Sequence, residues 1–470
     1  MRAAVIGLAC LVAAAARAES PPAAADPPDA VDLPAQPAPD PVDDAGGVPP
    51  ALRDFANVLL DPDAPSTTGV GRWLKGEYLS GDWLGWRTRL EDAGVRFAAT
   101  YVTDILGNPV GGLNHKLRYY HDIGLDLRLD LARLARVPGA LLHVSASSRA
   151  GTSLSDEDIG NVFNVSQTCC EPHTRIVNLA WEQTLFDERV EIHAGYLSTG
   201  DAFATSPLYW LFLTSGIDAN PGSLAFNVPF SEYPDSALGA RARWKPVRAF
   251  DLHVGLYNGS IISNAGLSDS LSVRFDDGVL GLVEGGYHAA FGDPARPLFG
   301  HYRLGGYAHS GRFRRFDAPA GSDLPRDVEH GNGGVYALVD QMIWRSAATP
   351  TADSALIPFL ALVGAPDATV NTFPFFFNMG LVLRGPFRGR EQDSAVFGLL
   401  YGGFSDVLRD SQRAAGMPAQ DFEMVLEWSY VLQVTPWFQF QPDLQYVIRP
   451  GGTGNIPDAL VVGAQISVNL

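Results

Sequence analysis

Lysine, cysteine and long apolar runs are scarce in this sequence of 470 residues. Lysine supplies 3 of the 34 basic residues, and the formal net charge is −18. A chain this acidic, without a basic run, is not expected to bind nucleic acid. Beyond the N-terminus no apolar run reaches the roughly 18 residues of a membrane-spanning helix, which excludes a helical membrane protein. Charged residues make up only 18% of the chain and apolar residues 46%, so a wholly disordered protein is also excluded.

The N-terminus has the pattern of a secretion signal. Arg2 is followed by an apolar run over residues 3–16, and then by small residues around a cleavage point after Ala18. We therefore predict a signal peptide over residues 1–18. The apolar run is too short for an anchor that spans a membrane.

Two cysteines, Cys169 and Cys170, remain once the signal peptide is removed, and they are adjacent in sequence. In an oxidising compartment each has only the other as a partner within the chain. A disulfide between neighbouring residues is strained, so a bonded pair and two free thiols in a loop stay equally open.

Two segments lie between the signal peptide and the first predicted strand. Residues 19–70 are rich in Pro, Ala and Asp, and predict an acidic, disordered linker in the periplasm. Residues 71–94 predict a short helical segment at the periplasmic mouth, with Asp82 as its cap and Gly94 at its end. Helical spacing places four residues on one face: Trp83, Trp86, Arg87 and Leu90. Arg87 either plugs or braces the mouth, or it forms an ordinary surface ion pair.

From residue 95 to residue 470, apolar and polar residues alternate with the period of a β-strand. The clearest case is residues 122–131, where Ile and Leu alternate with charged residues and Gly. Pro442 interrupts one such segment, and there we expect a bulge. Sixteen segments start near residues 95, 117, 139, 174, 189, 236, 250, 278, 300, 332, 355, 374, 393, 420, 437 and 458.

The connections between these segments tend to alternate between long and short. A soluble sandwich has no reason to place its long loops at one end, whereas an outer-membrane barrel has short periplasmic turns and long external loops. We therefore predict an all-β fold, a sixteen-stranded antiparallel transmembrane barrel in the outer membrane of a Gram-negative bacterium, with both termini in the periplasm. Lipid cannot solvate an open sheet edge, so the barrel must close. Sixteen strands enclose more space than side chains fill, which predicts a water-filled lumen.

Four segments of the chain are recognisable as motifs. They are residues 81–87 (GDWLGWR), 201–210 (DAFATSPLYW), 300–307 (GHYRLGGY) and 434–452 (VTPWFQFQPDLQYVIRPGG). With them the chain resembles the carbohydrate-selective porin family, or OprB-type porins, over residues 70–470. The resemblance implies facilitated diffusion of carbohydrates, chiefly monosaccharides such as glucose.

Other functions were weighed against this expectation. The physical pattern alone gives a pore, so a general diffusion porin with a weak preference for cations is the alternative. The sequence has no GxSxG, HExxH, paired CxxC or P-loop motif, so we expect neither an enzyme nor a bound cofactor or metal. The expected partners are sugars and outer-membrane lipid, and the barrel is a monomer or a homotrimer.

Sugar passage requires hydrogen-bonding groups that replace water around the solute and still release it. The candidates are a bracing residue at the mouth and polar residues on inward faces: Arg87, Asp122, Asp126, Arg128, Glu182, His193, Asp201, Arg241, Arg243, Glu284, Gln341, Glu423, Glu427, Gln439, Asp443 and Gln445. Arg241 and Arg243 lie side by side on one strand and offer rigid donor forks, with Glu423 and Glu427 as plausible acidic partners. The alternative is an ion-pair network in the wall that never touches sugar. Residues 201–210 either fold inward as a constriction or form an external loop.

Overall fold

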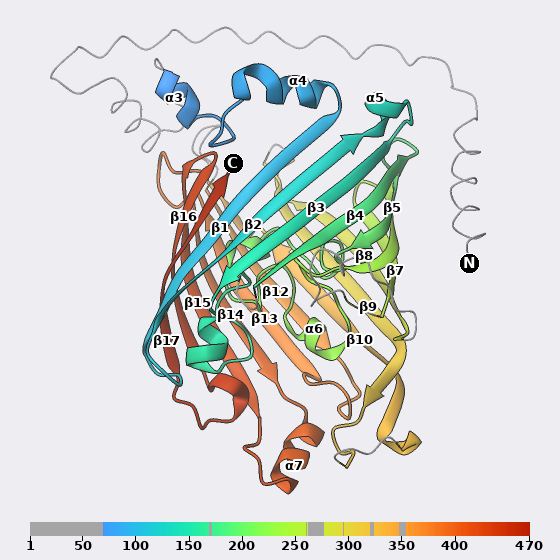
Figure 1. Ribbon diagram of the computed structural model, residues 1–470, viewed down its shortest axis with the longest axis vertical. Helices are drawn as coiled ribbons and strands as arrows, with labels where there is room; N and C mark the ends of the chain where they lie inside the picture. The colour runs from blue at the N-terminus through green and yellow to red at the C-terminus, as the bar shows by residue number, and fades with distance from the viewer. Residues whose placement is uncertain are drawn as a thin grey trace, which may run out of the picture. The chain divides into compact units, whose positions relative to one another are not determined.

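From Val95 onward, the alternating sequence forms one continuous antiparallel sheet (Figure 1). The computed structural model describes residues 69–168, 172–259, 261, 277–294, 296–319, 324–346 and 354–470. The predicted signal peptide, nearly all of the acidic linker, and both Cys169 and Cys170 lie outside the described residues.

The sheet closes into a barrel. Its strands are β1 (Val95–Val110), β2 (Leu117–Asp130), β3 (Ala140–Gly151), β4 (His173–Leu185), β5 (Val190–Leu197), β6 (Ala237–Val247), β7 (Phe250–Asn258), β8 (Val279–Phe291), β9 (Leu298–Arg314), β10 (Val328–Gln341), β11 (Trp344–Arg345), β12 (Ala355–Gly364), β13 (Phe375–Arg384), β14 (Ser394–Gly403), β15 (Phe422–Thr435), β16 (Phe438–Ile448) and β17 (Ala459–Asn469). β10 and β11 both pair with β12, so they are two pieces of one barrel strand, and sixteen strands surround the lumen. β1 pairs with both β2 and β17, which removes the sheet edges that lipid could not solvate.

The strands begin within a few residues of the positions predicted from the sequence, and two details differ. β1 runs to Val110, into a stretch expected to be loop, because its end still pairs with β17 after a shift in register that follows Gly107. Pro442 produces no bulge: β16 keeps one register through it against both neighbours. Proline removes a single ladder donor, and the residues on either side maintain the pairing. The irregularity lies instead between Gln433 and Thr435, next to the turn into β16.

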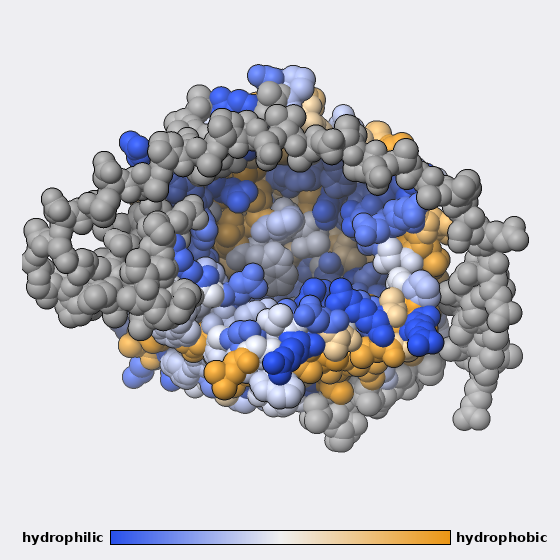
Figure 2. Space-filling view, turned by 90° about the horizontal axis from the view of Figure 1, so that it is seen from above, coloured by the Kyte–Doolittle hydropathy of each residue, from blue (hydrophilic) through white to orange (hydrophobic). Residues whose placement is uncertain are grey.

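The two faces of the sheet meet different surroundings. On β2, Ile123 and Leu125 are exposed on the outer face, whereas Asp122 on the inner face is buried. Large exposed apolar residues continue in this way around the outside, and Figure 2 shows a hollow lined largely by hydrophilic residues at one end of the barrel. Exposed aromatic residues gather on the outer face at the strand ends next to the short connections: Trp181, Trp244, Phe250, Tyr287 and Trp344. Such a band is typical of the membrane interface, and it marks this end as the periplasmic rim.

The helices are short and lie in the connections. They are α3 (Gly69–Leu74), η1 (Trp83–Gly85), α4 (Trp86–Asp92), α5 (Leu131–Ala135), η2 (Ser155–Ile159), η3 (Tyr209–Leu211), α6 (Ser223–Asn227), η4 (Pro325–Asp327), α7 (Asp406–Ala414) and η5 (Pro450–Gly452). Within the described part of the chain, none of the helices has the length and apolar character needed to cross a membrane.

The buried core lies inside the barrel, where two connections fold inward. One joins β5 to β6 and carries the buried Phe203 and Phe230; the other joins β3 to β4 and carries the buried Phe163. Phe163 packs 5.0 Å, centroid to centroid, from Phe373, which follows β12. These aromatic contacts give the inward connections an apolar core of their own within a polar lumen.

The segment before β1 differs from the single helix that its spacing predicts. Leu84 has a φ of +59°, and Gly85 is left-handed as well, so the chain kinks between η1 and α4. Gly85, not Asp82, is the N-cap residue of α4, but Asp82 Oδ1 still accepts from the backbone N–H and the hydroxyl of Thr88 in the first turn, both at 2.9 Å. The kink separates the side chains expected on one face: Arg87 is 5% exposed and turned toward the barrel, whereas Trp86 is 59% exposed.

Arg87 braces this segment against the barrel. Its guanidinium donates to the Phe97 carbonyl at 3.0 Å and to the main-chain oxygen of Leu470 at 3.1 Å. It is stacked 3.7 Å from the Tyr78 ring centroid and 4.3 Å from that of Trp83. One side chain therefore ties the segment to both the first and the last strand.

Replacing Arg87 should loosen the segment while leaving the barrel intact. Hydrogen bonds to a charged group contribute about 1.5–3 kcal/mol each, and Arg87→Ala removes both of those that cross to the strands. We expect faster proteolysis within residues 69–94 and an unchanged heat-modifiable barrel band on gels. Arg89→Ala, at an exposed position on the same helix, is the control, and equal protease sensitivity of the two variants would contradict the bracing role.

Candidate functional site

The connection between β5 and β6, residues 198–236, crosses the lumen and is held by carboxylates of the far wall. The Leu213 N–H donates to Glu427 Oε1 at 2.7 Å, and the Thr214 N–H donates to Glu427 Oε2 at 3.0 Å. Glu427 is fully buried on the inner face of β15, and two charge-assisted bonds satisfy both of its oxygens. The predicted segment 201–210 is thus part of an inward constriction loop.

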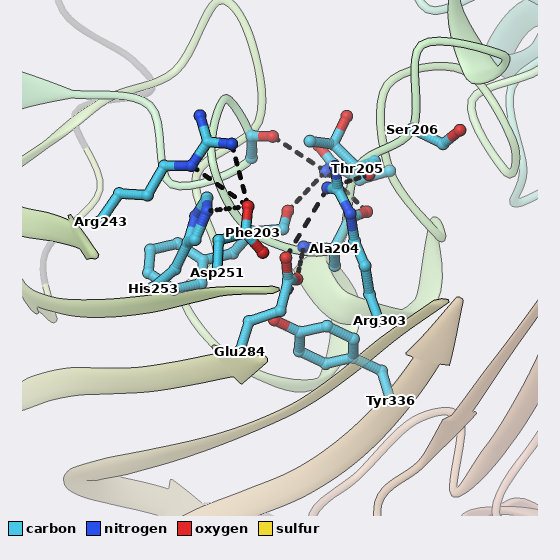
Figure 3. Close-up of polar contacts among 12 residues, drawn as sticks. Phe203, Ala204, Thr205, Ser206, Arg243, Asp251, His253, Glu284, Arg303 and Tyr336 are labelled. Carbon is cyan, nitrogen blue, oxygen red and sulfur yellow. Dashed lines mark hydrogen bonds and ion pairs between the residues drawn. The ribbon is translucent and has the colours of Figure 1, made fainter. Parts of the chain in front are cut away.

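A second carboxylate, Glu284 on β8, holds the beginning of the same loop (Figure 3). Its Oε2 accepts from the Ala204 N–H at 2.8 Å and from the Tyr336 hydroxyl at 2.9 Å. Arg303 lies 3.7 Å from Glu284 and donates to the Thr205 carbonyl at 2.6 Å. The acid and the base together fix two consecutive residues of the loop.

The connection between β3 and β4 forms the other half of the constriction. Glu423 on β15 accepts from the N–H groups of Val162 and Phe163 at 2.9 and 2.8 Å, and from Gly451 at 2.7 Å. Gln445 on β16 donates to the Val165 carbonyl at 2.7 Å. The inner wall therefore binds the backbone of both loops.

The two loops also pair with each other across the lumen. The Gln167 N–H donates to the Leu213 carbonyl at 2.9 Å, and the Ser215 N–H donates to the Asn164 carbonyl at 2.8 Å. Because each loop is bonded to the wall and to the other loop, the constriction is a built element of fixed geometry.

One edge of the constriction loop is acidic. Arg175 on β4 forms an ion pair with Asp235, and the Arg149 guanidinium lies 5.5 Å from the Tyr233 ring centroid. Burial raises the pKa of Asp218 and of Glu232 well above the usual carboxyl range, because the charged forms lose water. Acidic loop groups therefore face basic groups of the wall.

Toward the periplasmic rim, the wall between β2 and β5 carries a chain of acids and histidines. Asp126 Oδ2 lies 2.5 Å from His143 Nε2, and His143 Nδ1 lies 3.1 Å from Glu182. Glu182 continues to His193 at 3.5 Å, and Arg128 pairs with Asp126 at 3.1 Å. His143 is buried at the centre of this chain of groups, and the others are partly exposed. Asp126 forms hydrogen bonds with His143 and Arg128, and His143 forms one with Glu182, whereas His193 meets Glu182 in an ion-pair contact.

The two neighbouring arginines of β6 do not pair with Glu423 and Glu427, which corrects the partner expected from the sequence. Arg243 binds Asp251 at 2.9 Å and lies 3.7 Å from Glu191. Arg241 donates over a longer distance, 3.4 Å, to the Ser198 carbonyl, and it lies near Asp201 and Tyr257. Glu423 and Glu427 instead accept hydrogen bonds from backbone N–H groups of the inward loops, whereas Asp251 and Glu191 lie on the strands next to β6.

Comparison with known proteins identifies the family. Residues 114–470 match the model of the carbohydrate-selective porin, OprB family. The chain belongs to this family. It is 25% identical to Porin B of Pseudomonas aeruginosa over 83% of this chain and 90% of that protein. It is 23% identical to the putative porin QuiX of Acinetobacter baylyi, over 84% and 93% of the two chains.

A solved structure supports the same fold. The high-pH structure of Pseudomonas putida OprB superposes with a TM-score of 0.77 at 22% identity, over 84% of this chain and 99% of that one. Like the other OprB-family porins, the chain is a Gram-negative outer-membrane barrel, and its fold and family are those of a channel.

The remaining candidates of this carbohydrate-selective porin are structural or lie at the rim. Asp122 binds Ser147 at 2.7 Å and Arg149 at 3.3 Å, and Asp443 accepts from Ser429 at 2.5 Å and from Gln445 at 2.8 Å. Gln341 was expected on an inward face, but in the register of β10 it shares the outer face with the exposed Val335; it lies at the periplasmic end of the strand and accepts from the Tyr302 hydroxyl at 2.7 Å. Gln439 is near the start of β16, 3.5 Å from Gln441. Asp201 is exposed, within reach of the positive charge of Arg241.

Several site residues were missed by reasoning from the sequence. His143 and Arg149 belong to a polar row at period two on β3, so the alternation itself could have revealed them. Asp251 also alternates with the apolar Phe250, Leu252 and Val254 of β7, so the same signal could have revealed it, whereas Arg303 lies among the glycines of residues 300–306, where nothing local marks it. In the part of the chain that the structure covers, no group of three or more His, Cys, Asp or Glu is arranged to hold a metal ion.

Removing the carboxylate of Glu427 should release the constriction loop. Glu427→Ala leaves two buried N–H groups unpaired, at about 1–3 kcal/mol each, so the loop should become mobile. We expect a larger and noisier single-channel conductance in planar bilayers. Glu191→Ala is the charge-matched control, because Glu191 also faces the lumen, from β5, but bonds Lys245 at 2.7 Å and lies 3.7 Å from Arg243. Equal conductance of the two variants would show that Glu427 does not hold the constriction.

Proposed function

We propose that the chain passes monosaccharides such as glucose by facilitated diffusion through its lumen. The observation that carries the proposal is the constriction: two inward loops narrow a sixteen-stranded barrel, and the nearby wall presents paired acids, histidines and arginines. An uncharged, hydroxyl-rich solute exchanges its water for such donors and acceptors without a net electrostatic barrier. Membership of the carbohydrate-selective family supports the same solute class.

Within the lumen, we infer a division of labour among the candidate residues. Glu284, Glu423, Glu427, Asp443 and Gln445 are bonded to loops or to one another, so we assign them to shaping the pore. The groups we assign to sugar are the partly exposed ones: Asp126, Arg128, Glu182, His193, Asp201, Arg241 and Arg243. Among these, Arg241 and Asp201 lie beside the constriction, and Arg241 has donor groups to spare.

Swelling of liposomes that contain the purified protein tests the solute class. We expect glucose to enter faster than a neutral amino acid of similar size, because the amino acid is zwitterionic and has fewer hydroxyls to replace its water. A disaccharide should enter more slowly than either. Rates ordered by size alone would instead indicate a general diffusion porin.

A variant of Arg241 tests the assigned residue. Arg241→Ala removes the most lightly bonded donor fork of the inner wall, so the preference for glucose over the amino acid should fall severalfold, while the conductance to salt changes little. The control is Arg315→Ala, since Arg315 pairs with Asp317 and Glu329 beyond the opposite end of the barrel. An unchanged preference in Arg241→Ala would remove this residue from the site and leave the proposed function standing.

A further inference from the structure

The segment that precedes the barrel exposes a cluster of large apolar side chains. Leu84 is 99% exposed and Trp86 is 59% exposed, and Trp83 and Leu90 are exposed beside them. The left-handed kink at Leu84 turns this residue away from the protein. Because Arg87 fixes this segment, the four exposed apolar side chains stay at the surface, where a partner outside the chain could cover them.

Two aromatic contacts place this segment at the outer side of the rim. The Trp83 ring lies 6.3 Å from that of Phe97, which pairs in register with Leu127 on the outward face of β1 and β2. The Trp73 ring lies 4.9 Å from that of Trp437, which adjoins Phe438 at the start of β16. Both contacts are made with the periplasmic ends of strands, at the level of the exposed aromatic band.

We propose that residues 83–90 form a lipid-binding foot that inserts into the periplasmic leaflet of the outer membrane beside the barrel. Its apolar side chains continue the lipid-facing surface of β1 past the end of the strand. Trp side chains prefer the interface, and short amphipathic segments lie in the interfacial plane with their apolar face buried.

The charged residues of the foot suit a phospholipid surface. The Arg89 guanidinium lies 5.3 Å from the Trp86 ring centroid and is exposed, in position for a phosphate group. Glu91 and Asp92 follow on α4. Their carboxylates favour a zwitterionic headgroup, because its ammonium group would donate hydrogen bonds to them. The ligand is therefore phospholipid, with a zwitterionic headgroup favoured over a purely anionic one.

The size of the cluster argues for lipid over a second copy of the chain. Leu84 is 99% exposed, Trp86 59%, Leu90 39% and Trp83 37%, so at no more than about 250 Å² per side chain the cluster offers at most about 600 Å². A standard protein interface buries roughly 800 Å² on each partner. A lipid surface needs no such minimum, because the barrel already holds the foot at the interface.

Photocrosslinking from the full-length barrel in vesicles tests the proposal. Trp86 is replaced by p-benzoylphenylalanine in proteoliposomes of phosphatidylethanolamine and phosphatidylglycerol, and lipid adducts are measured by mass spectrometry. The positive control is the same probe at Leu304, which is 68% exposed on the outer face of β9. The negative control is the probe at Met417, which is 55% exposed beyond α7, at the far end of the barrel from the foot. A heat-modifiable band shows that each labelled protein has folded.

The outcomes separate the possible partners. Lipid adducts at position 86 comparable with those at 304, and severalfold above those at 417, support the foot; an excess of ethanolamine adducts supports the headgroup assignment. A lipid yield no higher than at 417 overturns the proposal. So does an adduct with a second copy, or with another part of the same chain, since the cluster would then be a protein interface.

Discussion

Carboxylates on the inner wall that accept backbone N–H groups are the interaction on which the pore depends. A loop that enters a barrel loses water from its peptide groups, and each unpaired N–H is costly. Glu284, Glu423 and Glu427 supply the missing acceptors on two strands, β8 and β15. Together with the bonds between the two loops, they hold residues 152–168 and 198–236 in the lumen. The width of the channel therefore follows from three side chains that face away from lipid.

This use of charge explains how a pore that is proposed to pass uncharged sugars can hold so many ionisable groups. Most of the acids are matched by a base or by amides, as Asp251 is by Arg243 and Asp126 by His143. In each pair the opposite charges offset one another, so the net charge of the pair is small, while its donors and acceptors keep fixed directions. Such a wall favours neutral, hydroxyl-rich solutes over ions, whereas a wall with unpaired charge of one sign would select counter-ions.

The fold was predictable because its signal is local. Each strand has one face toward lipid and one toward the lumen. The alternation of residues 122–131 therefore predicts a strand without reference to any other part of the chain. For the site, the sequence predicted many of the polar residues that face the lumen but not which of them contact one another. Which acid meets which base depends on barrel closure and on loops that arrive from over 200 positions away, as Leu213 does at Glu427. For that reason Arg243 was matched with the wrong acids, although all of them were correctly expected to face inward.

The segment before the barrel shows the same limit on a smaller scale. Helical spacing places Arg87 with Trp83 and Trp86, but positive φ at Trp83, Leu84 and Gly85 rotates the chain between them. Left-handed φ at Leu is uncommon, and the flanking Gly81 and Gly85 absorb the turn in the conformation that glycine adopts at little cost. The strain is accepted where it sends Arg87 inward to the first and last strands and leaves the apolar side chains outside. A regular helix would suit the local helix propensity, but Arg87 would then lose its contact with either the first or the last strand. The kink is therefore the conformation that attaches the segment to the barrel.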